Sequence, residues 1–185
     1  EAVLAPVAAL QETLFAEITG RIKQNDDTVP YLDRGSWYYA RFREGQEYPV
    51  HCRRADAPDA AEQVLLDVNV LAEGHAFFQA RGTTVSSGGG VLAWADDAVG
   101  RRLYTIRFKD LATGAILPDA IPNASGNHVW AEDDRTLFYT KKDPGTLRPF
   151  QVGRHTLGAD PARDALVYQE DDETFSVGVS KTKSR

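Results

Sequence analysis

The chain has 185 residues, of which 42% are hydrophobic and 26% are charged, which suits one or two globular domains and excludes an intrinsically disordered chain. The net charge of −6 argues against a general nucleic-acid-binding protein, whose binding surface would be basic. No apolar run approaches the ~20 residues that a membrane-spanning helix needs, so no membrane partner is expected.

Residues 6–23 are expected to form an amphipathic helix. Pro6 suits the first position of a helix, and the run ends before Asn25. The apolar residues recur three, four or seven positions apart, as on one helical face: Val7, Leu10, Leu14, Phe15, Ile18 and Ile22. An N-terminal helical segment is therefore assigned to residues 1–30. Its apolar face must pack on the sheets of this chain or on a further domain, and both alternatives stay open.

The rest of the chain is predicted to be almost entirely β. Tyr104, Ile106 and Phe108 alternate with polar residues, which is the pattern of a strand with one buried face. Turn-forming clusters separate the other short apolar runs. The expected strands are 36–42, 48–54, 64–68, 76–86, 91–95, 104–109, 115–117, 128–131, 136–140, 149–157, 164–168 and 174–181.

These strands repeat along the chain. The segments 48–51, 104–107 and 150–153 align with one another at steps of 56 and 46 residues, and an aromatic hairpin strand precedes each. Four strands per unit at this period are typical of β-propeller blades. Residues 31–185 are therefore predicted to form about two and a half to three four-stranded blades, fewer than the ~4–8 that close a propeller.

Four groups of segments along the chain carry distinctive sequences: 9–15, 65–69 with 72–75, 99–102 with 107–114, and 137–139 with 142–144 and 147–149. These segments resemble the oligopeptidase B (protease II) branch of the prolyl oligopeptidase family of serine peptidases. They occur in the family's order along the whole chain, which corresponds to the opening part of such an enzyme. At Ser86–Gly90 the chain has three glycines where the family usually has a Ser-Pro-Asp-Gly turn. More flexibility is expected in that hairpin.

The resemblance implies a helical segment leading into a seven-bladed propeller, with an α/β-hydrolase domain formed by sequence beyond Arg185. It implies that a Ser-His-Asp triad in that domain cleaves short peptides after Arg or Lys, and that the propeller keeps folded proteins out. The implied partners are the catalytic domain of the same protein and short basic peptides. The chain starts at Glu1 and contains no Met, and the strand-like alternation over 174–181 is followed by no partner, so both ends are expected to be cuts.

No catalytic, cofactor-binding or metal-binding residue is predicted. Ser180 lacks the second glycine of the G-x-S-x-G motif and is expected in a strand. His51 and Cys52 are strand neighbours that point to opposite faces. A single cysteine excludes an internal disulfide and fits a reducing compartment. The remaining histidines are too scattered for metal-ligand spacing: His75, His128 and His155.

Other candidate groups are assigned structural roles. The Asp pairs 96–97, 133–134 and 171–172 lie at turns, where Asp side chains bond the local backbone, and Ser87–Gly90 is expected to be a hairpin turn. The basic pairs 53–54, 101–102 and 141–142 are interpreted as solvated rims. The aromatic residues expected in the core between blades are Trp37, Tyr39, Trp94, Trp130 and Phe138.

Three functions remain in competition. The first is the gating part of an oligopeptidase B-like peptidase, inactive alone because nucleophile and base lie outside it. The second is a propeller that acts as a protein- or peptide-binding scaffold, and the third is a glycosidase that uses paired carboxylates. Exposed blade edges predict self-association, and the expected location is the cytoplasm, with the periplasm left open.

Overall fold

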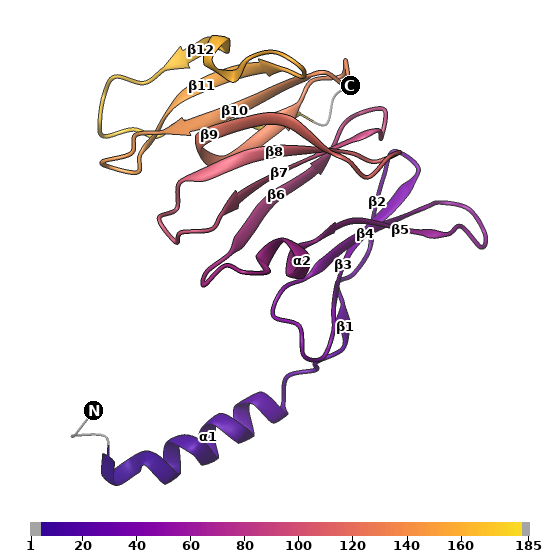
Figure 1. Ribbon diagram of the computed structural model, residues 1–185, viewed down its shortest axis with the longest axis vertical. Helices are drawn as coiled ribbons and strands as arrows, with labels where there is room; N and C mark the ends of the chain where they lie inside the picture. The colour runs from indigo at the N-terminus through magenta and orange to yellow at the C-terminus, as the bar shows by residue number, and fades with distance from the viewer. Residues whose placement is uncertain (1–4, 183–185) are drawn as a thin grey trace. The chain divides into compact units, whose positions relative to one another are not determined.

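The computed structural model describes residues 5–182, and the chain divides into two compact units, Glu1–Asn69 and Val70–Arg185. Figure 1 traces helix α1 first and then antiparallel strands as far as β12 (Ala165–Gln169). Within the described range, no helix has both the length and the apolar character needed to cross a membrane. The prediction of a mainly β chain with an N-terminal helix is confirmed.

The N-terminal helix is shorter than predicted. A 3-10 turn, η1 (Ala5–Val7), precedes α1 (Ala8–Gly20), so the helix covers the centre of the expected range 6–23. In the part of the chain that the structure describes, no residue of α1 is buried. Its apolar side chains are exposed by 46–70%: Leu10, Leu14, Phe15 and Ile18. The apolar face of α1, which the sequence predicts to pack on another element, is therefore exposed to solvent in the first unit.

The first unit contains one antiparallel sheet. Its strands are β1 (Asp26–Asp27), β2 (Tyr31–Asp33), β3 (Ser36–Phe42), β4 (Val50–Ala55) and β5 (Glu62–Asp67). β1 pairs with the end of β3 and β2 pairs with its start, so these two pieces share one strand position beside β3. Sequence analysis missed both, because Pro30 interrupts the run and cannot donate a ladder hydrogen bond.

The second unit is a seven-stranded antiparallel sheet in chain order. A short helix, α2 (Val68–Ala72), spans the boundary between the units and was not predicted. A 3-10 turn, η2 (Pro161–Arg163), connects the last two strands of this sheet. Its strands are β6 (Gln79–Val85), β7 (Val91–Asp97), β8 (Tyr104–Asp110), β9 (Ile116–Trp130), β10 (Thr136–Lys142), β11 (Pro149–Thr156) and β12 (Ala165–Gln169).

Strand β9 belongs to two four-stranded groups. Residues 116–124 pair with β8 and residues 124–130 pair with β10, so β6–β9 and β9–β12 are consecutive meanders that share it, as Figure 1 shows. The prediction of two strands, 115–117 and 128–131, separated by a loop was wrong. Asn123 and Gly126 adopt positive φ angles of 57° and 85°, and the register of both pairings shifts in this region. The turn residues bend a continuous strand where it changes partner.

The core of the second unit lies where the two meanders meet. Tyr104, Ile106 and Phe108 of β8 are at most 1% exposed, which confirms the predicted alternation. They pack in one cluster with Ala93, Ala95, Ile121, Ala124, Trp130, Leu137 and Tyr139. Trp94 is also buried, but it points to the opposite face of β7 from Ala93 and Ala95. The other aromatic residues predicted in the core, Trp37, Tyr39 and Phe138, are only partly buried.

Residues 174–181 form no strand, contrary to the prediction. Side chains, together with one backbone bond from the Val177 N–H to the Pro149 carbonyl oxygen at 3.0 Å, hold this part of the chain in place of a partner strand. The Arg148 guanidinium donates to the backbone carbonyl oxygens of Glu170, Asp172 and Phe175. The Asn127 amide donates to the Val179 carbonyl at 2.9 Å and accepts from its N–H at 2.7 Å. These bonds satisfy backbone groups that a sheet neighbour would otherwise bond.

Candidate functional site

The residues that resemble catalytic groups in the sequence do not come together. Ser180 is exposed and lies in irregular chain rather than in the predicted strand. The Cys52 thiol contacts the carbonyl oxygen of Val50 at 3.7 Å, and burial raises its pKa to about 11, so the thiol stays protonated at neutral pH. Burial lowers the pKa of the neighbouring His51. A thiolate–imidazole pair needs the opposite shift at the cysteine.

The three remaining histidines have different surroundings. The His75 ring lies 5.6 Å from the Phe78 ring. His128 is buried in β9, neither ring nitrogen makes a hydrogen bond there, and burial lowers its pKa to about 4. His155 is completely buried in β11 between two carboxylates. Across residues 5–182, no three His, Cys, Asp or Glu side chains gather in a way that could hold a metal ion.

A buried polar network surrounds His155. Its Nδ1 lies 2.7 Å from Asp164 Oδ1 and its Nε2 lies 2.9 Å from Asp119 Oδ1. The Tyr139 hydroxyl donates to Asp164 Oδ2 at 2.8 Å, and the Gly158 N–H donates to Asp119 Oδ1 at 2.7 Å. Asp119 comes from the first half of β9, whereas His155 is on β11, so the network ties the two meanders together.

The His155 network lacks the features of a catalytic triad. A general base needs a ring nitrogen in reach of a nucleophile, whereas both His155 nitrogens face aspartate oxygens. The hydroxyl of Tyr139 is a poor nucleophile here, because burial and then Asp164 raise its pKa. The arrangement satisfies buried polar groups. Sequence analysis singled out His155 but not Asp119 or Asp164, which lie 36 and 9 positions away from it.

Of the paired aspartates that the sequence offered as carboxylate catalysts, Asp97, Asp133 and Asp172 bond local groups, whereas Asp134 accepts from the distant Gly88 N–H. Asp133 accepts from the N–H and hydroxyl of Thr136 and Asp172 accepts from those of Thr174, while Asp97 accepts from backbone N–H groups of its own turn. Asp96 accepts from Arg107 Nε at 2.8 Å. The prediction that these aspartates make local bonds at turns is confirmed for Asp97, Asp133 and Asp172. Ser86–Gly90 forms the predicted hairpin turn between β6 and β7.

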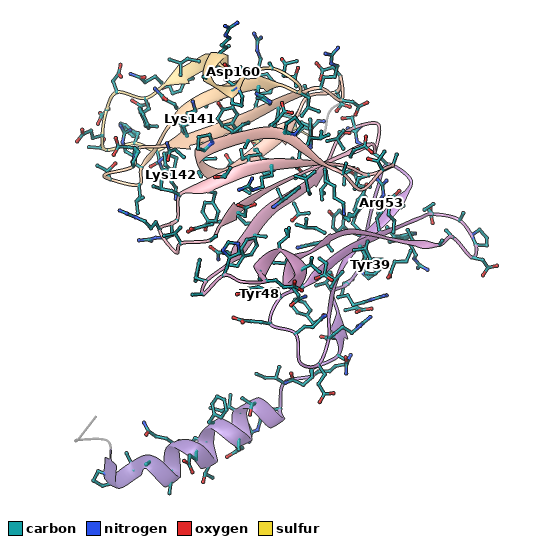
Figure 2. The ribbon with its side chains drawn as sticks, viewed as in Figure 1. Tyr39, Tyr48, Arg53, Lys141, Lys142 and Asp160 are labelled. Carbon is teal, nitrogen blue, oxygen red and sulfur yellow. The ribbon has the colours of Figure 1, made fainter. Side chains whose placement is uncertain are left out.

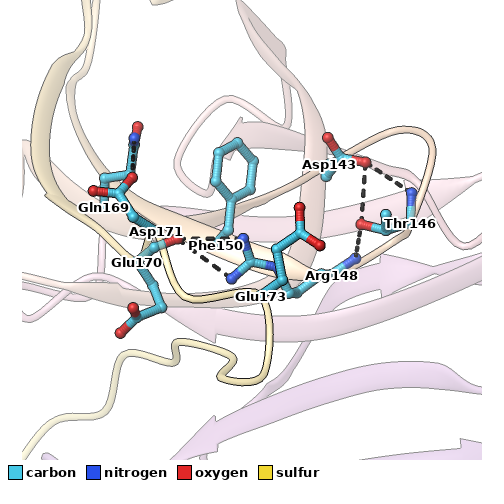
Figure 3. A pocket seen from close by; sticks show the side chains of 8 residues that line it. All are labelled: Asp143, Thr146, Arg148, Phe150, Gln169, Glu170, Asp171 and Glu173. Atoms are coloured by element: carbon cyan, nitrogen blue, oxygen red, sulfur yellow. Dashed lines mark hydrogen bonds between the residues drawn. The ribbon is translucent and has the colours of Figure 1, made fainter.

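A shallow pocket of about 230 Å³ lies beside the β10–β11 turn (Figure 3). Its lining is mostly polar and acidic: Asp143, Thr146, Arg148, Phe150, Gln169, Glu170, Asp171 and Glu173. Arg148 is committed to backbone carbonyls and stacks 5.6 Å from the Phe150 ring. The Asp143 carboxylate accepts from Gly145 N and Thr146 N, and the bonds from Thr146 lower its pKa. The pocket side chains therefore stabilise a turn and the segment after β12.

The family model described as "Prolyl oligopeptidase, N-terminal beta-propeller domain" matches residues 1–185. The chain belongs to this family. The described strands agree with this family, since they form consecutive four-stranded antiparallel groups.

Curated relatives of this propeller domain are peptidases. The chain is 48% identical to dipeptidyl aminopeptidase BI of Pseudoxanthomonas mexicana over 99% of its own length and 27% of that protein. It is 32% identical to protease 2 of Moraxella lacunata over 98% of its length and 27% of that protein. The chain thus spans about a quarter of the length of these relatives.

Solved structures of oligopeptidase B share the fold of this propeller domain. The structure from Leishmania major superposes with a TM-score of 0.84 at 32% identity, over 95% of this chain and 25% of that one. The closed form from Trypanosoma brucei with covalently bound antipain gives 0.86 at 29% identity, over 97% and 25%. The resemblance that the sequence motifs indicated is confirmed at the level of the family.

Proposed function

We propose that the chain forms the first blades of the propeller of an oligopeptidase B-like serine peptidase that cleaves short peptides after Arg or Lys. The family match over residues 1–185, together with the likeness to oligopeptidase B from Leishmania major, carries this proposal. In it, the propeller limits the size of the substrates that reach a separate α/β-hydrolase domain. That domain supplies catalysis and substrate specificity, so both are properties of the full-length protein.

The chain by itself is proposed to be inactive. Nucleophilic catalysis needs a hydroxyl or thiol beside a base that a third group orients. Among the described residues, the best-oriented imidazole is that of His155, and its two nitrogens are bonded to carboxylates. The buried, protonated thiol of Cys52 offers no alternative nucleophile.

Two further properties are proposed for the isolated chain. Leu166, Val167 and Tyr168 of the edge strand β12 are 50–59% exposed, and an apolar edge strand favours association between copies. Analytical ultracentrifugation should detect dimers or larger species, and a monomer at every concentration would contradict this. A cytoplasmic location is proposed from the reduced Cys52, and fractionation of cells into periplasm and cytoplasm tests it.

A second candidate function is removal of dipeptides from the amino end of peptides. It is favoured by the 48% identity to a protein named dipeptidyl aminopeptidase BI, which exceeds the 32% identity to protease 2. The two functions differ in what they require of the substrate: a dipeptidyl aminopeptidase needs a free α-amino group, whereas an endopeptidase also cleaves a blocked peptide.

The test uses the full-length protein that carries this chain, with two chromogenic substrates that both end in Arg. One has a free amino end two residues before the cleaved bond, and the other has a blocked amino end. Hydrolysis of the blocked substrate supports the oligopeptidase function, and hydrolysis of the free one alone supports the second candidate. Hydrolysis of neither would favour a binding scaffold. A folded protein with exposed Arg loops should remain uncut, and its rapid cleavage would refute size filtering.

A further inference from the structure

Two cationic side chains from different elements lie over the ring of Tyr104, which is 1% exposed at the start of β8, and the backbone of a third cationic residue, Arg102, bonds one of them. The Arg81 guanidinium carbon lies 5.2 Å from the ring centroid, and Arg81 Nη1 donates to the Tyr104 hydroxyl at 3.4 Å. Lys142 Nζ lies 5.8 Å from the same centroid and donates to the carbonyl oxygen of Arg102 at 2.8 Å. Arg81, Arg102 and Lys142 are called the cationic cluster below.

Neighbouring groups fix the position of the cationic cluster. The stem of Arg81 lies against Gly126, where a Cβ atom would be only 2.7 Å from Arg81 Cδ. The Arg102 N–H donates to Asp97 at 2.7 Å and fixes the turn before β8. Figure 2 labels Lys142 near the end of β10. Because β6, the turn before β8 and β10 each contribute one residue, the cluster depends on the folded sheet, and Arg81 and Lys142 are held in place before any ligand arrives.

The cationic cluster has no counter-charge in direct contact. None of its members forms an ion pair with a carboxylate of residues 5–182, although the chain carries a net charge of −6. Other cations of the described residues are paired: Arg107 lies 2.8 Å from Asp96, and Arg41 lies 2.7 Å from Glu62.

The electrostatics of Lys142 agree with an excess of positive charge. Burial and then the charges of Arg81 and Arg102 lower its pKa. Asp97 opposes them with the smallest effect, and its carboxylate already accepts backbone N–H bonds. Like charges held together at a partly buried position repel one another, and an anion bound among them removes that cost.

We propose that Arg81, Arg102 and Lys142 bind the C-terminal carboxylate of a peptide. Two guanidinium groups and one ammonium group supply enough donors for both oxygens of one carboxylate, and charge-assisted bonds of this kind are the strong ones. The choice of a peptide rests on the proposed function, since every cleavage of a peptide bond leaves a fragment with a new terminal carboxylate. Two cations over one ring, with a third cationic residue bonded to one of them, form a compact site, unlike the extended stripe that a polyanion needs.

The test is calorimetric titration of the full-length protein with acetyl-trialanine and with its C-terminal amide. Neither peptide contains a basic residue or a free amino end, so neither proposed activity consumes it. We expect the acid to bind roughly 10-fold more tightly than the amide, which corresponds to about 1.4 kcal/mol. Combining Arg81→Gln with Lys142→Gln should reduce the affinity for the acid to that for the amide.

Lys141→Gln is the matched control, because Lys141 is the next residue of β10 and its ammonium lies 5.8 Å from a different ring, that of Tyr139. It should leave the affinity for the acid unchanged. Thermal unfolding checks the fold of each variant, and Lys142→Met, which keeps the side-chain volume, replaces the double variant if that unfolds. Equal affinities for acid and amide, or a preference that survives both sets of substitutions, would overturn the proposal.

Inorganic phosphate is the third probe in the same titration. Binding of phosphate without binding of the acid would assign the cluster to small inorganic anions and also overturn the proposal. Because the titration does not depend on hydrolysis, a protein that binds the acid but cleaves no peptide would refute only the proposed peptidase function.

Discussion

Gly153 of β11 occupies a position that admits no side chain, and Gly153→Ala should strongly destabilise the second unit. A Cβ atom there would lie 2.5 Å from Tyr139 Cζ and 2.7 Å from its hydroxyl oxygen, whereas Tyr139 is completely buried. The ring must therefore move, which weakens the bond from its hydroxyl to Asp164. Overpacking costs about 1–3 kcal/mol. A buried carboxylate that loses a donor costs about 1–3 kcal/mol more, so the unfolding free energy should fall by roughly 2–6 kcal/mol.

Urea unfolding followed by tryptophan fluorescence measures this change, because Trp94 and Trp130 are buried in the second unit. Gly90→Ala is the matched control: a Cβ atom at Gly90 meets nothing within 4 Å, so its effect should stay within about 0.5 kcal/mol. Equal stability of the Gly153 and Gly90 variants would refute the steric argument. A double variant with Tyr139→Leu should lose less than the two single losses together, since the two positions are in contact.

Two further predictions concern pH and the C-terminal segment. The folded pKa of His128 is about 4, below its ordinary value of 6.5, so the unfolded chain binds more protons between these pH values. Stability should fall by about 3 kcal/mol from pH 7 to pH 4 through this group, and His128→Leu should remove that part of a pH series of urea titrations. Arg148→Lys should release residues 170–175, because one ammonium cannot reach three carbonyls. Limited proteolysis should then cut this segment faster than in the wild type, and unchanged cleavage would contradict the role of Arg148.

Local features of the fold could be predicted from the sequence. The three hairpins β3–β4, β7–β8 and β10–β11 coincide with the three aligned repeats, because a hairpin needs only two strands and the turn between them. The alternation of Tyr104, Ile106 and Phe108 predicted their burial correctly. The segments that resemble the prolyl oligopeptidase family also predicted the family correctly, as the match of the family model over residues 1–185 shows.

Features that depend on distant partners could not be predicted. The continuity of β9 depends on β8 for its first half and on β10 for its second half, so its turn residues suggested a loop. Residues 174–181 have the alternation of a strand, but the Asn127 side chain bonds Val179 where a strand would pair. The short strands β1 and β2 form because each pairs with a different end of β3.

By itself, the sequence determined the family, the mainly β fold and the positions of the hairpins, because these depend on residue order and local periodicity. Only the tertiary structure decided the role of His155, since its partners Asp119 and Asp164 reach it from other parts of the sheet. The same holds for the cationic cluster: Arg102 and Lys142 were interpreted from the sequence as solvated rims, and Arg81 was not singled out. Arg81 and Lys142 meet at the Tyr104 ring, and Lys142 bonds the Arg102 carbonyl oxygen, only because the folded sheet brings β6, β10 and the turn before β8 together.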